Sequence, residues 1–362
     1  MLTDPVRLAL VIAGALLLVP SAPSSGHIAF LIGVGVVLVI ATWRGARRAT
    51  LVLLVVGGIC VRLAIIDKVG SDVLTVTEAA IRRMLAAENP YGIGYNESSP
   101  PGAPFPYGPI ALLWYVPAGS FAEILEVGAG IAVTVFLALR GRLIGLAVYA
   151  ASTLLINSSI DGSNDTTLGL LILAAFVAAE RWPLAGAGIL GLAVGFKLSA
   201  LAFVPMFVAW GGVRVGAFVV AASLIAWAPV IANWGIASFL RSVQLAEATH
   251  RVPTWSLGRI VTDFTGSKVP FLDNLRYALG GAVVLASLAI PRRTLDTVIL
   301  TGVAVYVVTL FAGNWASYAY FAGIAPVICW RLDGWLGITS TPVLRWPPRA
   351  PQDAPEVEAA QV

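Results

Sequence analysis

Long stretches that are apolar on every helical face are the feature that most constrains this chain. Residues 8–19, 28–42, 51–66 and 215–232 contain almost no polar positions. A surface helix of a soluble domain instead carries a polar back behind its apolar stripe. Only 12% of the 362 residues are charged, and the mean hydropathy is +0.88. The sequence therefore predicts an all-α polytopic membrane protein with roughly 10–12 transmembrane helices.

Cysteine content and net charge exclude several other classes of protein. The two cysteines, Cys60 and Cys329, both lie in apolar runs, which argues against a disulfide framework or a zinc site. The net charge of +4 comes from short basic clusters that are typical of cytoplasmic loops and of contacts with anionic lipid. We therefore expect membrane lipid and no nucleic acid among the partners.

The basic clusters also predict a topology, because Lys and Arg collect in short cytoplasmic loops. They lie at Arg44–Arg48, Arg140 with Arg142, Arg181, Arg214, Arg292 with Arg293, and Arg331. An even number of crossings must join each neighbouring pair. The stretch 107–139 would be about 50 Å long as a helix, against a bilayer core of about 30 Å. We expect one crossing with a re-entrant or interfacial piece there, and two crossings are the alternative.

Several segments need separate interpretation. Residues 8–19 are expected to be a retained first helix, with a signal peptide as the alternative. Segments 184–196 and 199–210 are each too short to cross a bilayer, which predicts a broken hairpin with Lys197 near its apex. The tail is rich in proline and charge, so residues 333–362 are predicted to be disordered and cytoplasmic.

The first outer loop, 67–107, carries the most informative pattern. Residues 73–87 have the periodicity of an amphipathic helix of about four turns, which would lie in the plane of the membrane interface. Ser71 or Asp72 would begin this helix, where backbone NH groups favour a carboxylate. Asp72 is therefore either a capping residue or a functional one. Five prolines between Pro100 and Pro109 then stiffen the chain, as an aromatic edge or merely as a linker.

Two further polar positions interrupt apolar sequence. Asp161, Asn164 and Asp165 lie between two helices, where they could bind a sugar, bind a divalent cation or cap the helix 166–179. Lys197 is flanked by apolar residues, so it requires an anionic partner unless its amine reaches the lipid headgroups. A longer outer loop, 234–274, contains the adjacent His250 and Arg251.

These residues carry a resemblance to a known family. Asp72, the turn Asn89-Pro90-Tyr91 and the entry Pro106-Tyr107-Gly-Pro109 resemble the first outer loop of the GT-C membrane glycosyltransferases. The most similar group is glycosyltransferase family 87, the polyprenyl-phosphate-mannose-dependent α-mannosyltransferases. Asp161-Gly-Ser-Asn164-Asp165 and the segment Gly188–Lys197 are also similar to elements of that family. The glycine that the family has before its turn is replaced here by Ala87 or Glu88.

The resemblance covers residues 50–210 well and 211–332 loosely. It implies N-terminal transmembrane helices in 1–50, a catalytic module in 51–210 and C-terminal transmembrane helices in 211–332. Asp72 would be the catalytic base, with Asp67 as the fallback. Residues of the donor-phosphate and substrate sites follow by the same resemblance: Lys197, His250 and Arg251 at the phosphate, and Asp67, Tyr91, Tyr107, Asn164 and Asp165 at the substrate.

The implied reaction transfers a sugar from a polyprenyl-phosphate donor to a glycolipid or polysaccharide acceptor on the extracytoplasmic side of the cell membrane, with inversion. Mannose is favoured by the resemblance, and arabinose and glucose remain open. We expect no metal and no other cofactor. The rival classes are a secondary transporter or lipid flippase and an inactive scaffold. Transporters usually have two related halves with matching broken helices, whereas this sequence indicates a single broken hairpin.

Overall fold

Apolar runs of Leu, Ala, Val and Ile form nearly every regular element of the chain. The computed structural model describes residues 5–18, 47–66, 70–99, 101–119, 121–249, 255–267, 269–290, 293–314 and 316–338. The longer helices are α1 (Pro5–Leu18), α3 (Arg47–Ala64), α6 (Glu123–Leu139), α9 (Asp165–Ala179), α10 (Pro183–Phe196), α11 (Val204–Asn233), α14 (Phe271–Leu288), α15 (Leu295–Phe311) and α16 (Tyr320–Trp335). The shorter ones are α4 (Asp72–Leu85), α5 (Pro109–Tyr115), α7 (Leu143–Ala151), α8 (Thr153–Ser158), α12 (Ile236–Thr249) and α13 (Leu257–Thr265), with 3₁₀ turns η2 (Val116–Ala118) and η3 (Leu198–Phe203). The prediction of an all-α protein is confirmed.

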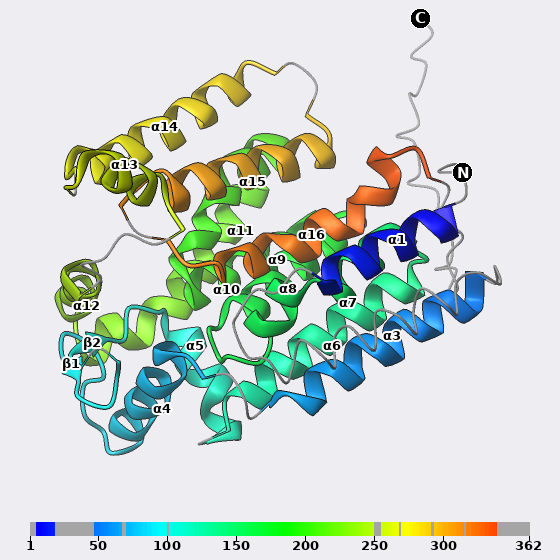
Figure 1. Ribbon diagram of the computed structural model, residues 1–362. Coiled ribbons are helices and arrows are strands. Elements are labelled where there is room, and N and C mark those ends of the chain that lie inside the picture. Colours follow the sequence, from blue (N-terminus) through cyan, green and yellow to red (C-terminus); the bar gives the residue numbers. More distant parts are fainter. Residues whose placement is uncertain are drawn as a thin grey trace, which may run out of the picture.

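A two-stranded sheet is the exception within the described part of the chain. Strand β1 (Gly94–Tyr95) pairs antiparallel with β2 (Ala103–Pro104), with Gly94 opposite Pro104. The sheet closes the loop between α4 and α5. It lies at the same end of the molecule as α4 and α12 (Figure 1).

Few of the described helices are long enough to span a bilayer as a single continuous helix. The segment Leu198–Asn233 is long and apolar enough by length and composition, although its backbone is non-helical at Gly212, and Pro109–Ala118 with Glu123–Leu139 passes only as a pair. The other apolar helices described, such as α9 and α10, have 15 and 14 residues. A straight crossing needs about 20 residues. Prolines, glycines and polar residues shorten these helices below the lengths expected from the apolar runs.

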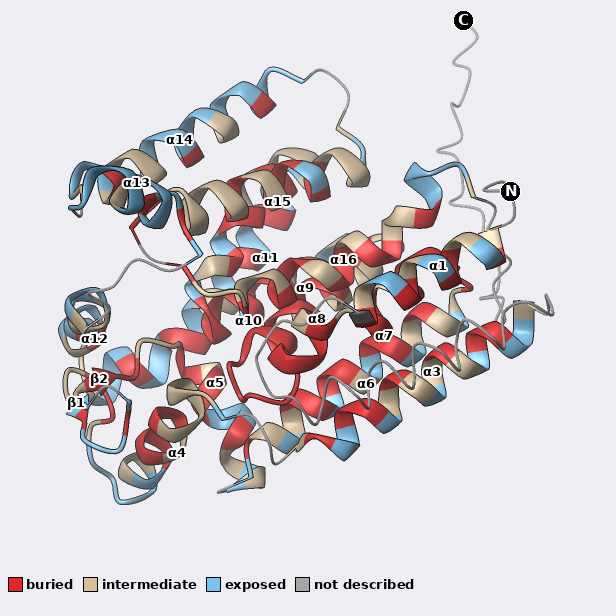
Figure 2. Cartoon of the chain, in the orientation of Figure 1, coloured by how far each residue is buried: buried red, intermediate tan, exposed pale blue. Residues whose placement is uncertain are grey.

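The centre of the bundle is formed by α7, α8 and α9, which are largely buried (Figure 2). Helix α16 packs against both α7 and α9, while α1 and α3 pack against α7. Glycines permit the close approach: Gly145 of α7 faces the Cys329 carbonyl, and Gly169 of α9 faces the Ala322 carbonyl. Small residues at such contacts are typical of helices that pack in lipid.

The stretch 107–139 forms one long helix and one short bent piece. Helix α5 and turn η2 precede α6, and the axes of the two parts differ by 100°. The stretch therefore contains one long helix and one short piece bent away from it, not two long helices.

The predicted broken hairpin at Lys197 is also observed. Helix α10 ends at Phe196, Lys197 is extended (φ −149°, ψ 126°), and η3 turns back. The chain reverses again at Gly212, whose φ of 79° is in the left-handed region that favours glycine. The second half of α11 then runs parallel to α10, because Gly191 and Gly195 contact Ala222 and Ala226 in order.

Two of the predicted cytoplasmic clusters, at Arg140 and at Arg331, lie close together in the described part of the chain. Glu180, which follows the last turn of α9, pairs with Arg140 at 3.2 Å and with Arg331 at 3.0 Å. Asp333 accepts hydrogen bonds from the backbone of Ile144 and Gly145 at the start of α7, at 3.2 and 2.9 Å. Because these bonds hold the last turn of α16, residues 333–335 belong to that helix and not to the predicted disordered tail. Residues 339–362 lie outside the described residues.

Candidate functional site

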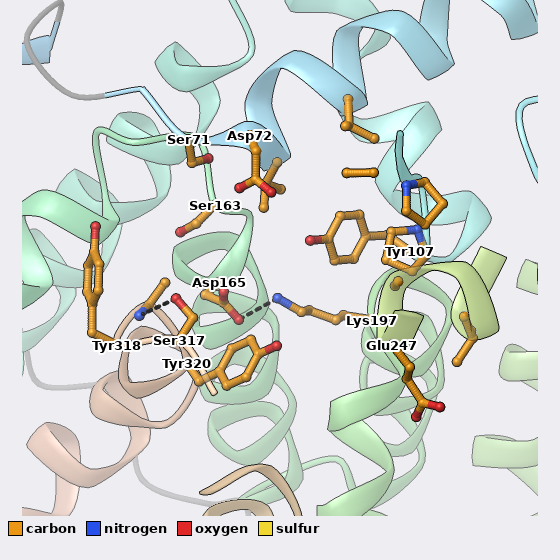
Figure 3. A pocket seen from close by; sticks show the side chains of 18 of the residues that line it. Ser71, Asp72, Tyr107, Ser163, Asp165, Lys197, Glu247, Ser317, Tyr318 and Tyr320 are labelled. Atoms are coloured by element: carbon orange, nitrogen blue, oxygen red, sulfur yellow. Dashed lines mark hydrogen bonds and ion pairs between the residues drawn. The ribbon is translucent and has the colours of Figure 1, made fainter. Parts of the chain in front are cut away.

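The first turn of α4 is held by Ser71 and not by Asp72. Ser71 is the N-cap, and its Oγ accepts a hydrogen bond from the Leu74 NH at 3.3 Å. The backbone NH of Ser71 donates to the Asp161 carbonyl at 2.9 Å, which ties the helix to the loop between α8 and α9. The capping alternative for Asp72 is therefore wrong, and its carboxylate lies in the wall of a cavity (Figure 3).

This cavity has a volume of about 350 Å³. Among the candidate site residues, it brings together Asp72, Tyr107, Asp161, Asp165 and Lys197, which come from three separate segments of the chain. The remaining polar lining comes from the residue before α4, the loop before α9, α12, α14, the residues between α15 and α16, and the start of α16: Ser71, Ser163, Glu247, Asp273, Arg276, Asn314, Ser317, Tyr318 and Tyr320.

Lys197 has the anionic partner that its burial requires. Its Nζ donates to Asp165 Oδ1 at 2.7 Å and to Asn164 Oδ1 at 2.9 Å. The ammonium also lies 5.1 Å from the ring centroids of both Tyr107 and Tyr320, a favourable cation–π geometry. Only 8% of Lys197 is exposed, so the prediction of an ion pair is confirmed and the headgroup alternative is wrong.

Asn164 occupies the N-cap position of α9 and Asp165 the first position of the helix, but the Asn164 side chain does not cap it. Asn164 has φ 61° and makes no capping hydrogen bond. Glu126 of α6 takes that role instead, because its Oε2 accepts from the backbone NH groups of Thr166 and Thr167 at 3.0 and 3.2 Å. The side chains of Asn164 and Asp165 are therefore both available to hold Lys197. Glu126 was not predicted from the sequence, although a carboxylate within the apolar stretch 107–139 was an available signal.

Asp161 is a further carboxylate of the cavity wall, and it is almost completely buried. It is 2% exposed and accepts hydrogen bonds from the Ser163 NH at 2.8 Å and from the Tyr318 hydroxyl at 3.1 Å. Burial raises the pKa of this carboxyl to about 7, although both hydrogen bonds act in the opposite direction. Asp161 is thus poised to gain or lose a proton near neutral pH.

A polar wall on α12 and α14 was missed by the sequence reasoning. Arg276 Nη2 lies 3.2 Å from Glu247 Oε1, and Asn314 Nδ2 donates to Asp273 Oδ2 at 2.8 Å. Asp273 and Arg276 are three residues apart, hence on one face of α14. That spacing at the start of an apolar helix was the available signal.

Other predicted site residues lie elsewhere. Tyr91 is buried outside the cavity, with ring centroids of Phe105, Trp234 and Phe239 at 5.7 to 5.9 Å. Asn164 is buried behind the cavity wall, where it contacts Lys197. Asp67, His250 and Arg251 lie outside the described residues. Within the described ranges, no group of three or more Asp, Glu, His or Cys side chains could hold a metal ion.

Comparison with known proteins gives no relative for this chain. No family model, no curated protein and no solved structure matches it. Function is therefore inferred from the cavity and its surroundings.

Proposed function

We propose that the protein is a polytopic membrane glycosyltransferase of the GT-C type. It transfers a sugar, mannose by resemblance, from a polyprenyl-phosphate donor to an envelope glycolipid or polysaccharide on the extracytoplasmic side. One observation carries the proposal: Asp72 shares a cavity with the buried Lys197–Asp165 pair, at the end of the bundle where the predicted outer loops gather.

The distribution of polar and apolar side chains supports membrane insertion. Large apolar residues lie on the outside of the helices, with Ile225 of α11 being 72% exposed. Arg62, Glu126 and Asp333 are instead fully buried. In water, exposing so much apolar surface would raise the free energy of the folded protein. Hydrocarbon around the bundle removes that penalty and requires the charged groups to point inward.

The cavity contains a suitable base for sugar transfer. Asp72 would accept the proton of an acceptor hydroxyl while that oxygen attacks the anomeric carbon of the donor. The bond between the anomeric carbon and the phosphate oxygen breaks on the opposite face, so the configuration inverts. The lipid phosphate leaves with the bonding electrons, and the proton remains on Asp72.

Lys197 is proposed to act at the leaving phosphate. Its ammonium is held by Asp165 and Asn164, so its position is fixed before the donor binds. Preorganised donors stabilise a developing negative charge more than they stabilise the intact diester, which lowers the barrier. Tyr107 and Tyr320 cover the ammonium and keep the site poor in water.

The replacement Asp72→Asn tests the proposed base. We expect it to lower transfer in isolated membranes by about 10²–10⁴-fold, the usual loss when a general base is removed. Asp263→Asn is the matched control, because Asp263 lies exposed on α13 and pairs with Arg259. Turnover of Asp72→Asn near that of the control would exclude Asp72 as the base. A transporter or a scaffold would tolerate both replacements equally.

A further inference from the structure

The charge of Lys197 is already compensated within the cavity. Asp165 Oδ1 lies 2.7 Å from the ammonium, Asn164 accepts a second N–H, and two tyrosine rings flank it. A lipid phosphate carries negative charge when it enters and gains more when it leaves. The described cavity walls therefore need a second cation to neutralise that ligand.

Arg276 is that cation among the residues described around the cavity. Only 14% of its side chain is exposed, and its guanidinium lies 4.7 Å from the Tyr277 ring centroid. Its Nη2 donates to the Tyr277 hydroxyl at 2.9 Å, while its buried Nε has no partner among the described residues. Gly313 leaves room for the Arg276 stem, because a Cβ on Gly313 would lie 2.8 Å from Arg276 Cδ.

The acidic partner of Arg276 is easily displaced. Glu247 Oε1 lies 3.2 Å from Nη2, but the Glu247 side chain is 61% exposed. Exposed ion pairs contribute little, since water competes for both groups. Phosphate offers the planar guanidinium two parallel hydrogen bonds, and such bonds to charged groups are about twice as strong as neutral ones. Asp273, on the same face of α14, is engaged by the backbone and side chain of Asn314.

We propose that Arg276 forms an anion subsite at the rim of the cavity, that this subsite takes the phosphate group of a lipid-linked ligand, and that Glu247 occupies it until the ligand arrives. The proposal rests on the function proposed above and names the residue that supplies the uncompensated positive charge. Glu247 then acts as an intramolecular competitor, because its carboxylate stands where a phosphate oxygen would bind.

Binding of farnesyl phosphate, a short polyprenyl phosphate, tests the subsite without any turnover. The full chain, purified in detergent micelles, is titrated while its intrinsic tryptophan fluorescence is recorded. We expect Arg276→Gln to raise Kd by about 10- to 100-fold, the loss expected for hydrogen bonds to a charged group. Glu247→Gln should lower Kd by about two- to fivefold, because the competitor is removed. Arg276→Lys should lie between wild type and Arg276→Gln.

Controls separate charge, lipid and folding effects. Arg259→Gln removes a cation of α13 that does not line the cavity, so its Kd should equal that of wild type. Farnesol lacks the phosphate, so its binding should not respond to Arg276→Gln. Inorganic phosphate should bind at least tenfold more weakly than farnesyl phosphate, and equal binding would overturn a lipid-linked ligand in favour of free phosphate. Equal unfolding temperatures of the variants show that all are folded.

Two results would overturn the subsite: a Kd for Arg276→Gln within twofold of wild type, or weaker binding by Glu247→Gln. These outcomes differ from a failure of the proposed function. If farnesyl phosphate binds through Arg276 but no sugar donor is ever consumed, the subsite stands and the transferase proposal fails. If sugar transfer occurs and Arg276→Gln binds normally, the subsite alone is wrong.

Discussion

Asp72 and Asp161 line one cavity, but the two carboxyl groups have different surroundings. Asp72, in the first turn of α4, is partly exposed in the cavity wall, whereas Asp161 is only 2% exposed. The Ser163 NH and the Tyr318 hydroxyl both donate to Asp161, yet burial raises its pKa to about 7. The nearby negative charge of Asp165 acts in the same direction as burial.

The raised pKa predicts how stability depends on pH. The folded protein binds the Asp161 proton more tightly than the unfolded chain, whose carboxyl titrates near 3.8. The contribution of Asp161 to stability is therefore fully present below about pH 4, is lost as pH rises towards 7, and is absent above that. The shift corresponds to about 4 kcal/mol at most. Asp161→Asn should flatten this part of the unfolding-temperature profile between pH 4.5 and 8 in detergent. Identical slopes for the variant and wild type would contradict the assignment.

At the level of residues, the sequence predicted that a buried charge requires a partner, but not which residue is that partner. The burial of Lys197 predicted an anionic partner, but not that Asp165 would be chosen, 32 positions earlier. That choice depends on how α9 packs against α10. The capping of α9 by Glu126, 40 positions before Thr166, likewise depends on helix packing that no local pattern encodes.

The position of Asp72 depends on how α4 docks on the loop between α8 and α9. Gly162 lies at the contact, with φ 72°. A Cβ at this position would lie 2.7 Å from Leu74 Cβ. The hydrogen bond from Ser71 to the Asp161 carbonyl completes the attachment. The loop is thus the platform that aims the first turn of α4 into the cavity.

Gly162→Ala should therefore impair sugar transfer indirectly, because the new methyl group contacts Leu74 and not the substrate. The new methyl group pushes against Leu74, and alanine in the left-handed region costs about 1–2 kcal/mol. A displacement of about 1 Å in the first turn of α4 would lower turnover by up to about 100-fold. Gly128→Ala is the control, because nothing lies within 4 Å of its added Cβ. Equal transfer rates for the two variants, measured at equal amounts of folded protein, would contradict this role of the loop.

At the level of elements, local sequence patterns predicted the helices and turns that are determined by neighbouring residues. The amphipathic pattern predicted α4, and the short apolar segments predicted the reversal at Lys197. The wall formed by α12 and α14 was not predicted, because its polar residues are separated by about one turn in otherwise apolar or mixed sequence. Their convergence arises from the packing of α14 on α15 and of α12 on β2.

For the whole molecule, the composition predicted the all-α class, and the basic clusters predicted which helix ends lie together. Arg140 and Arg331 meet at Glu180, as the assignment of their loops to one side requires. The count of roughly 10–12 crossings was drawn from apolar run lengths against the bilayer thickness. Several runs form helices of 14 to 17 residues instead, because proline and glycine interrupt them. The insertion of the bundle in a membrane and the side on which the cavity opens are therefore part of our proposal.

The most direct test of the proposed transferase is sugar transfer by the purified protein. Polyprenyl phosphates carrying labelled mannose, arabinose or glucose are supplied one at a time, with envelope glycolipids as acceptors, and the lipid and polysaccharide products are extracted. We predict that one donor, mannose by resemblance, yields a labelled product whose anomeric configuration is inverted. A folded protein that leaves the bond between sugar and phosphate intact in every donor, or that gives a product with retained configuration, would contradict the account.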